Sequence, residues 1–280
     1  EIEFASWFTT APILALTGSN GKTTSTLLLD AMCKSGGLNS IPTGNLGIPF
    51  SDVVLEELRT GNTPDVYVME VSSFQLEHIE HFSPHIGCIL NITPDHLDRY
   101  ENFDSYRFAK LNLLKSLREP GWFVYNADDP CLSDYASDQN PYHIPFSLNI
   151  HNRALFNLNE NKAYLSGQKK DDVLYYYKDS QLPGNHNKSN ILAAATIAYK
   201  YGISLAAIKQ AIDSFAPVPH RIEFCGSIHG AKCYNDSKAT NLHALSTALN
   251  CFESPIILIL GGKLKGDTEF ASIMQVLKKN

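Results

Sequence analysis

A glycine-rich stretch at residues 17–24, TGSNGKTT, constrains the fold of this chain most strongly. The short apolar run PILALTG (12–18) precedes it, and the segment 21–37 follows with apolar residues at helical spacing and glycines at its end. A buried strand that turns through glycines into a helix offers backbone N–H groups and the positive end of a helix dipole to an anion. The pattern predicts a phosphate-binding loop within a fold of alternating strands and helices.

The spacing of the glycines distinguishes this loop from the commonest phosphate loop. The pattern G-x-x-x-x-G-K-[ST] would require glycine at position 16, where the chain has Leu16, and the glycines instead form the shorter G-x-x-G-K-T-T. The lysine can reach the β- and γ-phosphates of a nucleotide, and a threonine hydroxyl can join a magnesium shell. A plain strand-to-helix turn is the alternative, which lysine followed by two threonines disfavours. The predicted nucleotide-binding residues of the loop are Gly18, Ser19, Asn20, Gly21, Lys22, Thr23 and Thr24.

Strands and helices alternate along most of the chain. Strand-like runs are expected at 65–71, 86–93 and 121–128, with a helix at 103–117. This order predicts an α/β fold with a central, doubly wound, mostly parallel sheet. Alternating apolar and polar residues at 150–180 predict antiparallel hairpins beside that sheet.

The pattern restarts after two expected helices at 190–202 and 204–215. The prolines of APVPHR (216–221) predict a hinge, which divides the chain into expected domains at 1–217 and 218–280. The second of these is predicted to be the start of a Rossmann-like α/β domain. It should hold a strand pair at 222–237, a helix at 239–252, a buried strand at 255–262 and a helix at 269–279.

Composition excludes several classes of function. The 280 residues carry a formal net charge of −6, so no basic excess favours nucleic-acid binding. No apolar run approaches the roughly 20 residues that span a bilayer, so no membrane association is expected. The six cysteines form no C-x-x-C pair, which argues against a zinc knuckle or a thioredoxin-type site. Scattered cysteines are typical of reduced thiols, and we expect a cytoplasmic monomer.

Two polar positions follow or end buried strands and are candidates for metal binding. Glu70 closes an apolar run in which a carboxylate without a partner would be costly, and ligands of doubly wound folds gather at the carboxyl ends of strands. His96 lies in NITPDHLDRY (91–100) after the next expected strand and could bind a metal or contact a substrate. A half-exposed strand carboxylate and a loop histidine without function are the respective alternatives.

Two further clusters precede helices. GNHNKSN (184–190) places Asn187 and Asn190 where they could cap a helix or face a nucleotide base. NDSKATN (235–241) places Asp236, Lys238 and Thr240 at another helix start, which favours anions, although a polar loop with a helix cap is the alternative.

Taken in order, the motifs resemble those of the Mur ligases, the ATP-dependent amino-acid-adding enzymes of bacterial peptidoglycan synthesis. The short loop is shared across that family and with folylpolyglutamate synthase. SSFQLE, DHLDRY and DSKATN are more selective and resemble the branch that joins D-glutamate to UDP-N-acetylmuramoyl-L-alanine. The resemblance covers nearly the whole chain and is weakest at about 130–180. The motifs are TGSNGKTT, GNLG (44–47), MEVSSFQLE (69–77), NITPDHLDRY, FAK (108–110), GNHNKSN, PHR (219–221) and NDSKATN.

The resemblance implies roles for the reacting groups. Lys22 and the loop backbone would hold the ATP phosphates, and Thr23 with Glu70 would bind a first magnesium ion. His96 and Lys110 would serve a second magnesium ion. Lys110 is implied to be carbamylated, since an ammonium would repel Mg²⁺ whereas a carbamate offers carboxylate-like oxygens. Lys238 completes the implied catalytic set.

The resemblance also implies binding residues. Those for the nucleotide outside the loop are Asn187, Asn190, Arg221 and Asp236. Those for the two other substrates are Asn45, Ser72, Ser73, Thr240 and Lys265, and the unusual spacing of GGKLKGDTEF leaves Lys263 as an alternative to Lys265.

Family members have three domains, so 1–217 corresponds to the central ATP-binding domain and 218–280 to the start of the C-terminal one. The first residue is Glu1 rather than methionine, and we expect a fragment without the UDP-binding domain. The alternatives are another Mur ligase or folylpolyglutamate synthase, a regulatory or transport P-loop NTPase, and a nucleotide-binding fragment without turnover.

Overall fold

The structure is a computed structural model that describes residues 1–133, 135, 140–149, 153–159, 162–166, 173–177, 181–182, 184–216, 218–252, 255–262, 273–274 and 277. Its helices are α1 (Ile2–Ser6), α2 (Lys22–Ser35), α3 (Phe50–Thr60), α4 (Ser73–Leu76), α5 (Phe103–Lys115), α6 (Pro130–Ser133), α7 (Asn185–Lys200), α8 (Leu205–Ser214) and α9 (Leu242–Leu249). Its strands are β1 (Ile13–Thr17), β2 (Ser40–Gly44), β3 (Val66–Glu70), β4 (Ile86–Ile89), β5 (Trp122–Asn126), β6 (His143–Phe146), β7 (Phe156–Leu158), β8 (Lys162–Leu165), β9 (Val173–Tyr176), β10 (Glu223–Ile228) and β11 (Ala231–Asn235).

The central sheet has six strands in the order β2-β3-β1-β4-β5-β6, and every neighbouring pair in it is parallel. The predicted doubly wound sheet is therefore confirmed. From β1 the chain proceeds to β2 on one side, whereas from β4 it proceeds to β5 on the other. Ligands of open α/β sheets bind outside the carboxyl ends of the strands at such a reversal. The loops after β1 and β4 therefore lie where a ligand site is expected.

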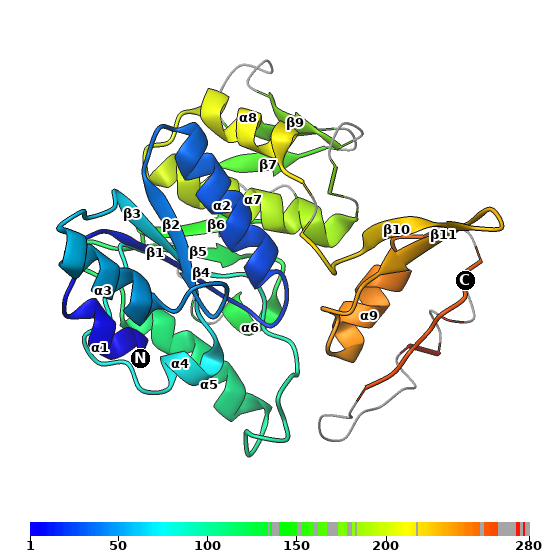
Figure 1. The fold of residues 1–280 in the computed structure, drawn as a ribbon, viewed down its shortest axis with the longest axis horizontal. Helices are drawn as coiled ribbons and strands as arrows, with labels where there is room; N and C mark the ends of the chain where they lie inside the picture. The colour runs from blue at the N-terminus through cyan, green and yellow to red at the C-terminus, as the bar shows by residue number, and fades with distance from the viewer. Residues whose placement is uncertain are drawn as a thin grey trace.

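Helices cover both faces of this sheet (Figure 1). One core lies under α2, α7 and α8, and residues such as Leu28, Ile191 and Ile208 contribute to it. The other lies under α3 and α5 and includes Phe50 and Tyr106. All five residues of β1 and of β3 are buried, as expected for parallel strands with both faces covered.

The small antiparallel sheet expected at 150–180 is present in the order β7-β8-β9. Its inward side chains, among them Phe156 and Leu174, join the core under α7 and α8. None of the described helices combines the length and hydrophobicity that a membrane span requires.

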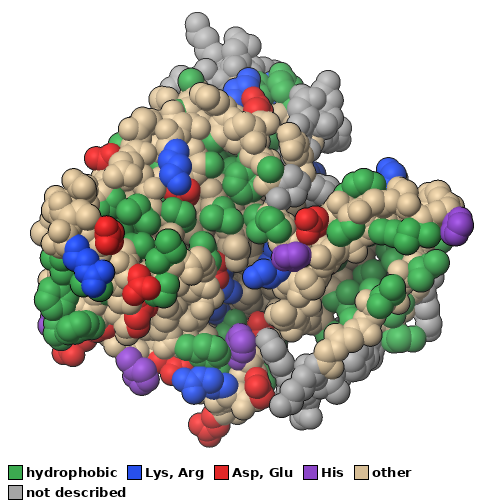
Figure 2. Space-filling model, in the orientation of Figure 1, with side chains coloured by type: hydrophobic (Ala, Val, Ile, Leu, Met, Phe, Trp, Pro, Cys, Tyr) green, Lys and Arg blue, Asp and Glu red, His purple; other side chains and the backbone are tan. Residues whose placement is uncertain are grey.

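Beyond the predicted hinge, β10 and β11 form an antiparallel pair that is followed by α9 (Figure 1). The strand predicted over 255–262 is wrong, because these residues form no strand, and Ile257 and Ile259 are 91% and 94% exposed. A buried parallel strand needs hydrogen-bonded neighbours, and β10 and β11 pair only with each other in the described part of the chain. Exposed apolar side chains line this region (Figure 2), Phe224 and Ile228 among them. The helix expected at 269–279 lies mostly outside the described residues.

Candidate nucleotide-binding site

The glycine-rich loop joins β1 to α2 at the centre of the sheet. Gly21 is the N-cap of α2 and adopts a left-handed conformation with φ of 85°. A side chain at this position would also collide with Asn190 Oδ1 on α7. Glycine is therefore favoured at position 21 both by the backbone conformation and by the close approach of the Asn190 side chain.

The segment after β4 fixes the shape of this loop. Asn91 Oδ1 accepts a 2.8 Å hydrogen bond from Asn20 N, and Asn91 Nδ2 donates a 3.0 Å bond to Asn20 O. Ser19 Oγ accepts from Thr93 N at 2.9 Å and lies 2.9 Å from the hydroxyl oxygen of Tyr106. The backbone of the loop is thus held in place by side chains from two other segments.

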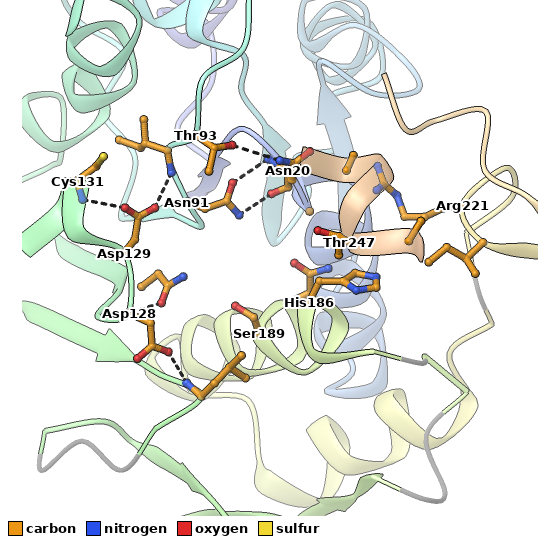
Figure 3. A pocket seen from close by; sticks show the side chains of 18 of the residues that line it. Asn20, Asn91, Thr93, Asp128, Asp129, Cys131, His186, Ser189, Arg221 and Thr247 are labelled. Atoms are coloured by element: carbon orange, nitrogen blue, oxygen red, sulfur yellow. Dashed lines mark hydrogen bonds between the residues drawn. The ribbon is translucent and has the colours of Figure 1, made fainter. Parts of the chain in front are cut away.

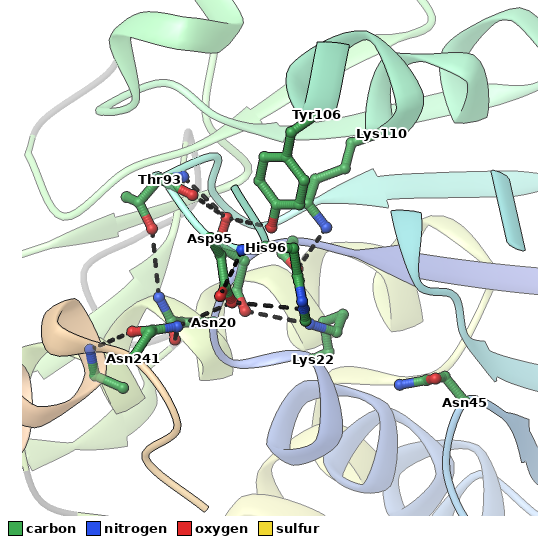
Figure 4. Close-up of polar contacts among 12 residues, drawn as sticks. Asn20, Lys22, Asn45, Thr93, Asp95, His96, Tyr106, Lys110 and Asn241 are labelled. Atoms are coloured by element: carbon green, nitrogen blue, oxygen red, sulfur yellow. Dashed lines mark hydrogen bonds and ion pairs between the residues drawn. The ribbon is translucent and has the colours of Figure 1, made fainter. Parts of the chain in front are cut away.

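Two lysines converge on the loop (Figure 4). Lys22 Nζ donates to Gly18 O at 2.8 Å and to Ser19 O at 3.2 Å, and Lys110 Nζ donates to Gly18 O at 2.9 Å. Lys110 is only 1% exposed. Burial, and then the positive charge of Lys22, lower the pKa of Lys110 well below its usual value. The ammonium group of Lys22 suits this place to an anion, whereas the lowered pKa of Lys110 favours its neutral amine.

Glu70 ends β3 beside the loop and is 3% exposed. Its Oε2 accepts a 2.8 Å hydrogen bond from Thr23 Oγ1, and its Oε1 accepts a 2.9 Å bond from Asn45 Nδ2. A buried carboxylate with neutral partners beside a hydroxyl oxygen fits a hard divalent cation. The described residues hold no group of three or more His, Cys, Asp or Glu side chains that could bind a metal. Phosphate oxygens and water would therefore have to supply the remaining ligands of such a cation.

His96 lies in the loop after β4 with φ of 55°. Its Nε2 is 3.8 Å from Asp95 Oδ2. The centroid of its ring lies 4.9 Å from the ring centroid of Phe74 and 6.4 Å from that of Tyr106. The fold therefore brings Asp95 and His96 to the same side of the loop as the two lysines (Figure 4).

A cavity of about 400 Å³ opens beside the loop. Figure 3 shows Asn20 and Asn91, Asp128 and Asp129, His186 and Ser189 of α7, and Arg221 and Thr247 around it. Segments on both sides of the predicted hinge therefore line one cavity, whose size suits a small organic ligand.

The predicted nucleotide-contacting residues outside the loop lie at or near this cavity. Arg221, Asp236 and Asn190 line it, and Asn190 Nδ2 donates to Asn187 Oδ1 at 3.2 Å. Both asparagines are buried within α7, whose N-cap is Gly184, so they do not cap the helix. Arg221 Nε is buried and has no hydrogen-bond partner among the described residues. Burial raises the pKa of Asp236, whereas a hydrogen bond from Ile222 N and the charge of Arg221 act in the opposite direction.

The predicted substrate residues are dispersed. Asn45 contacts Glu70, whereas Ser72 caps α4 by accepting from Gln75 N, and Ser73 is buried. Lys238 and Thr240 are exposed between β11 and α9. Lys265 and its alternative Lys263 lie outside the described residues.

Several side chains that hold the site together were not predicted from the sequence. Asn91 and Tyr106 hold the loop although each is more than 70 residues from its hydrogen-bond partner in the sequence. The position of Asn91 directly after a buried strand could have identified it, since the carboxyl ends of parallel strands share one edge of a sheet. The pairing of Tyr106 with Ser19 left no signal in the sequence.

Comparison with solved structures identifies the fold. A pseudomurein peptide ligase type C from Methanothermus fervidus superposes with a TM-score of 0.69 at 21% identity, covering 90% of this chain and 58% of that one. MurF from Acinetobacter baumannii superposes with a TM-score of 0.67 at 20% identity, covering 89% and 56%.

Sequence comparison narrows the relationship. UDP-N-acetylmuramoylalanine--D-glutamate ligase from Thermoanaerobacter sp. (strain X514) is 41% identical over 268 residues, which are 95% of this chain and 58% of that protein. The protein of the same name from Halalkalibacterium halodurans is 38% identical over 282 residues, which are 100% and 60%. The chain thus spans about 60% of the length of these relatives. The family model of the Mur ligase middle domain matches residues 16–198, which are more than half of this chain. The chain therefore belongs to the Mur ligase family.

Proposed function

We propose that this chain carries the ATP-binding part of a ligase that joins D-glutamate to UDP-N-acetylmuramoyl-L-alanine in peptidoglycan synthesis. The similarity to relatives of that name over 95% of the chain carries the proposal. The loop with Lys22, together with Lys110 and Glu70, supplies chemistry that such a reaction needs.

The reaction activates a poor electrophile. The carboxylate of the alanyl substrate attacks the γ-phosphorus of ATP, ADP leaves, and an acyl phosphate forms. The amine of D-glutamate then attacks the acyl carbon, phosphate leaves, and an amide remains after the loss of protons from nitrogen. Negative charge develops on the transferred phosphoryl group, so positively charged side chains placed around it lower the barrier.

The residues around the loop are suited to that task. Lys22 now donates to two loop carbonyls, and a bound phosphate would offer its ammonium better acceptors at the same place. Backbone N–H groups at the start of α2 point toward the same anion. We assign Gly18, Ser19, Asn20, Gly21, Lys22, Thr23 and Thr24 to the phosphates.

We assign a first magnesium ion to Thr23 and Glu70 and a second to His96 and a carbamylated Lys110. Magnesium ions neutralise phosphate charge and polarise the bond to the transferred group. The assignment of Lys110 follows the family resemblance, and its burial against Gly18 O would keep a carbamate away from bulk water. A carbonyl ¹³C signal after growth with ¹³C-bicarbonate, absent from Lys110→Met, would establish the carbamate.

We place the nucleoside in the cavity beside Asn187, Asn190, Arg221 and Asp236. The proposed domain boundary at 217 and 218 then runs through its wall, so closure at the hinge would complete the site. Asn45, Ser72, Ser73, Thr240, Lys238 and Lys265 stay assigned to the other substrates by resemblance. We infer a cytoplasmic location, where ATP is available.

A second candidate is nucleotide binding without turnover. It is favoured by the cavity beside the loop, which could hold a nucleotide without a second substrate. Another Mur ligase or a folylpolyglutamate synthase would share the loop but require a different amino acid.

Phosphate release from ATP, measured with the protein that contains these residues, tests the reaction. With UDP-N-acetylmuramoyl-L-alanine present, we expect release that depends on D-glutamate and not on L-glutamate or L-lysine. Lys22→Met should abolish it, whereas Lys34→Met, which changes an exposed lysine later in α2, should not. Release that ignores the amino acid would leave only an ATPase and refute the ligase assignment.

A further inference from the structure

Asn241 connects α9 to the phosphate-binding loop. It is the N-cap of α9, and its Oδ1 accepts a 2.8 Å hydrogen bond from Ala244 N. Its Nδ2 donates to Asn20 Oδ1 at 3.3 Å and to Asp95 Oδ2 at 3.1 Å (Figure 4). One side-chain amide therefore joins three segments that are far apart in the sequence.

The geometry uses the amide fully. A primary amide has two N–H protons and one carbonyl oxygen, and here the two protons face two acceptors while the oxygen caps a helix. Aspartate or serine would keep the cap but could not supply both donors. Glutamine carries the same amide on a longer arm, which places the oxygen beyond the N-cap geometry.

One of the two acceptors belongs to the machinery assigned above, and the other adjoins it. Asn20 lies in the loop that would hold the phosphates, and Asp95 precedes His96. Asn20 and Gly21 form one wall of the cavity, whereas Arg221, Thr247 and Ala248 form another. A ligand that fills the cavity needs both walls in place.

We propose that Asn241 is a positioning residue that couples the docking of α9 to the phosphate-binding loop. The proposal rests on the proposed function insofar as the loop binds a nucleotide. Without the two donated bonds, α9 would be docked for a smaller fraction of the time. The apparent affinity for a ligand that needs both walls falls in proportion to the fraction of molecules in which α9 is docked.

Asn241→Ser tests the proposal in the complete chain. Serine keeps the helix cap, so the melting temperature should stay unchanged. The Kd for the Mg²⁺ complex of a non-hydrolysable ATP analogue, measured by calorimetry, should rise at least about fivefold, the factor that corresponds to one net hydrogen bond, because two donated bonds are lost. Asn102→Ser is the matched control, because Asn102 caps α5 through Ser105 N and should leave the Kd unchanged.

Hydrogen exchange provides a second readout that loss of a cap alone would not change. In the unaltered chain, the nucleotide should slow exchange both at 18–24 and at 241–250. In Asn241→Ser without nucleotide, exchange at 241–250 should be faster than in the unaltered chain, and saturating nucleotide should restore the slow exchange there. If Asn241→Ser melts at a lower temperature, Asn241→Asp keeps a stronger cap and sets a carboxylate against Asp95, so it should show a larger loss of affinity.

An unchanged Kd and unchanged protection of α9 in Asn241→Ser would refute the coupling. If the unaltered chain binds no nucleotide, the proposed function fails instead. The coupling is then judged without ligand, where α9 must exchange faster in Asn241→Ser than in Asn102→Ser.

Discussion

Gly21 and Gly37 adopt nearly the same left-handed conformation, with φ of 85° and 86°, but in different surroundings. A methyl group at 21 would meet Asn190, whereas one at 37 would meet nothing within 4 Å. Gly37→Ala should therefore cost only the strain of a left-handed alanine, about 1 kcal/mol in the free energy of unfolding. Gly21→Ala adds a clash at the loop and should also abolish nucleotide binding.

Urea unfolding and calorimetry with Mg·ATP measure the two effects separately. Nucleotide affinity in Gly21→Ala equal to that in Gly37→Ala would show that the contact with Asn190 does not shape the loop.

Glu70 offers a test of the proposed first magnesium site. Glu70→Gln keeps the size of the side chain and removes its charge. Mg²⁺ should strengthen ATP binding to the unaltered chain, and this gain should shrink by about tenfold or more in Glu70→Gln. Titrations of each protein with ATP, with and without Mg²⁺, measure this gain in affinity.

Glu57→Gln is the control, since Glu57 of α3 is also buried but accepts its hydrogen bond from the hydroxyl group of Tyr67, away from the loop. An equal effect of Mg²⁺ in both variants would place the ion elsewhere.

Single residues differ in how far the sequence reveals them. The positions of Lys22 and Glu70 at the loop were predictable, because a lysine after a glycine turn and an acid within an apolar strand each carry a local chemical signal. Lys110 was identified only by resemblance, because a lysine on a helix gives no local sign that it will be buried. Asn91 and Asn241 act through partners far away in the sequence, so only the fold reveals them.

At the scale of elements, Glu3 fastens α1 to the segment after α4. Its carboxylate accepts hydrogen bonds from the backbone N–H groups of Glu80, His81 and Phe82 and from Trp7 Nε1. Burial by itself would raise the pKa of Glu3, but these hydrogen bonds lower it from 4.5 to about 2. The ionised form is therefore favoured by folding.

Because folding lowers the pKa of Glu3, its ionised carboxylate stabilises the protein above pH 4.5, and this stabilisation is lost as the pH falls toward 2. Glu3→Gln should reduce the free energy of unfolding at pH 7 by about 1–2 kcal/mol, which allows for solvent screening. The difference from the unaltered chain should vanish near pH 2. Glu56→Gln, an exposed change in α3, should have no effect at either pH. A difference that persists at low pH would show that the carboxylate's charge is not the cause.

The elements that the sequence predicted best are buried strands with continuous apolar runs, such as β1, β3 and β5. The pattern did not reveal β2, because Ser40, Pro42 and Gly44 are typical of turns, yet β2 pairs along its length with β3. Conversely, 255–262 has a strong apolar run and forms no strand. Propensity therefore decides a strand only where the fold supplies a partner for it.

At the scale of the whole molecule, the two core clusters contain residues from Ile2 to Ile212 and none from β10, β11 or α9. Asn241 joins the part beyond the predicted hinge to the rest of the chain, whereas the contact between the rings of Tyr234 and Phe252 lies within that part. Because burial of apolar surface supplies most folding free energy, this part should open without unfolding of the rest.

The two small antiparallel sheets allow a matched test of that division, and with it of the predicted boundary at 217 and 218. The sheet β7-β8-β9 rests on the main core through Phe156 and Leu174, whereas the residues of β10-β11 are exposed or half-buried. Hydrogen exchange should therefore give β7-β9 amides an opening free energy close to that of β1, and β10-β11 amides one lower by several kcal/mol. Mg·ATP should reduce the gap, because the cavity proposed for it is lined from both sides of the predicted hinge. Equal protection of the two sheets without nucleotide would mean that the chain unfolds as one unit and that the boundary has no energetic meaning.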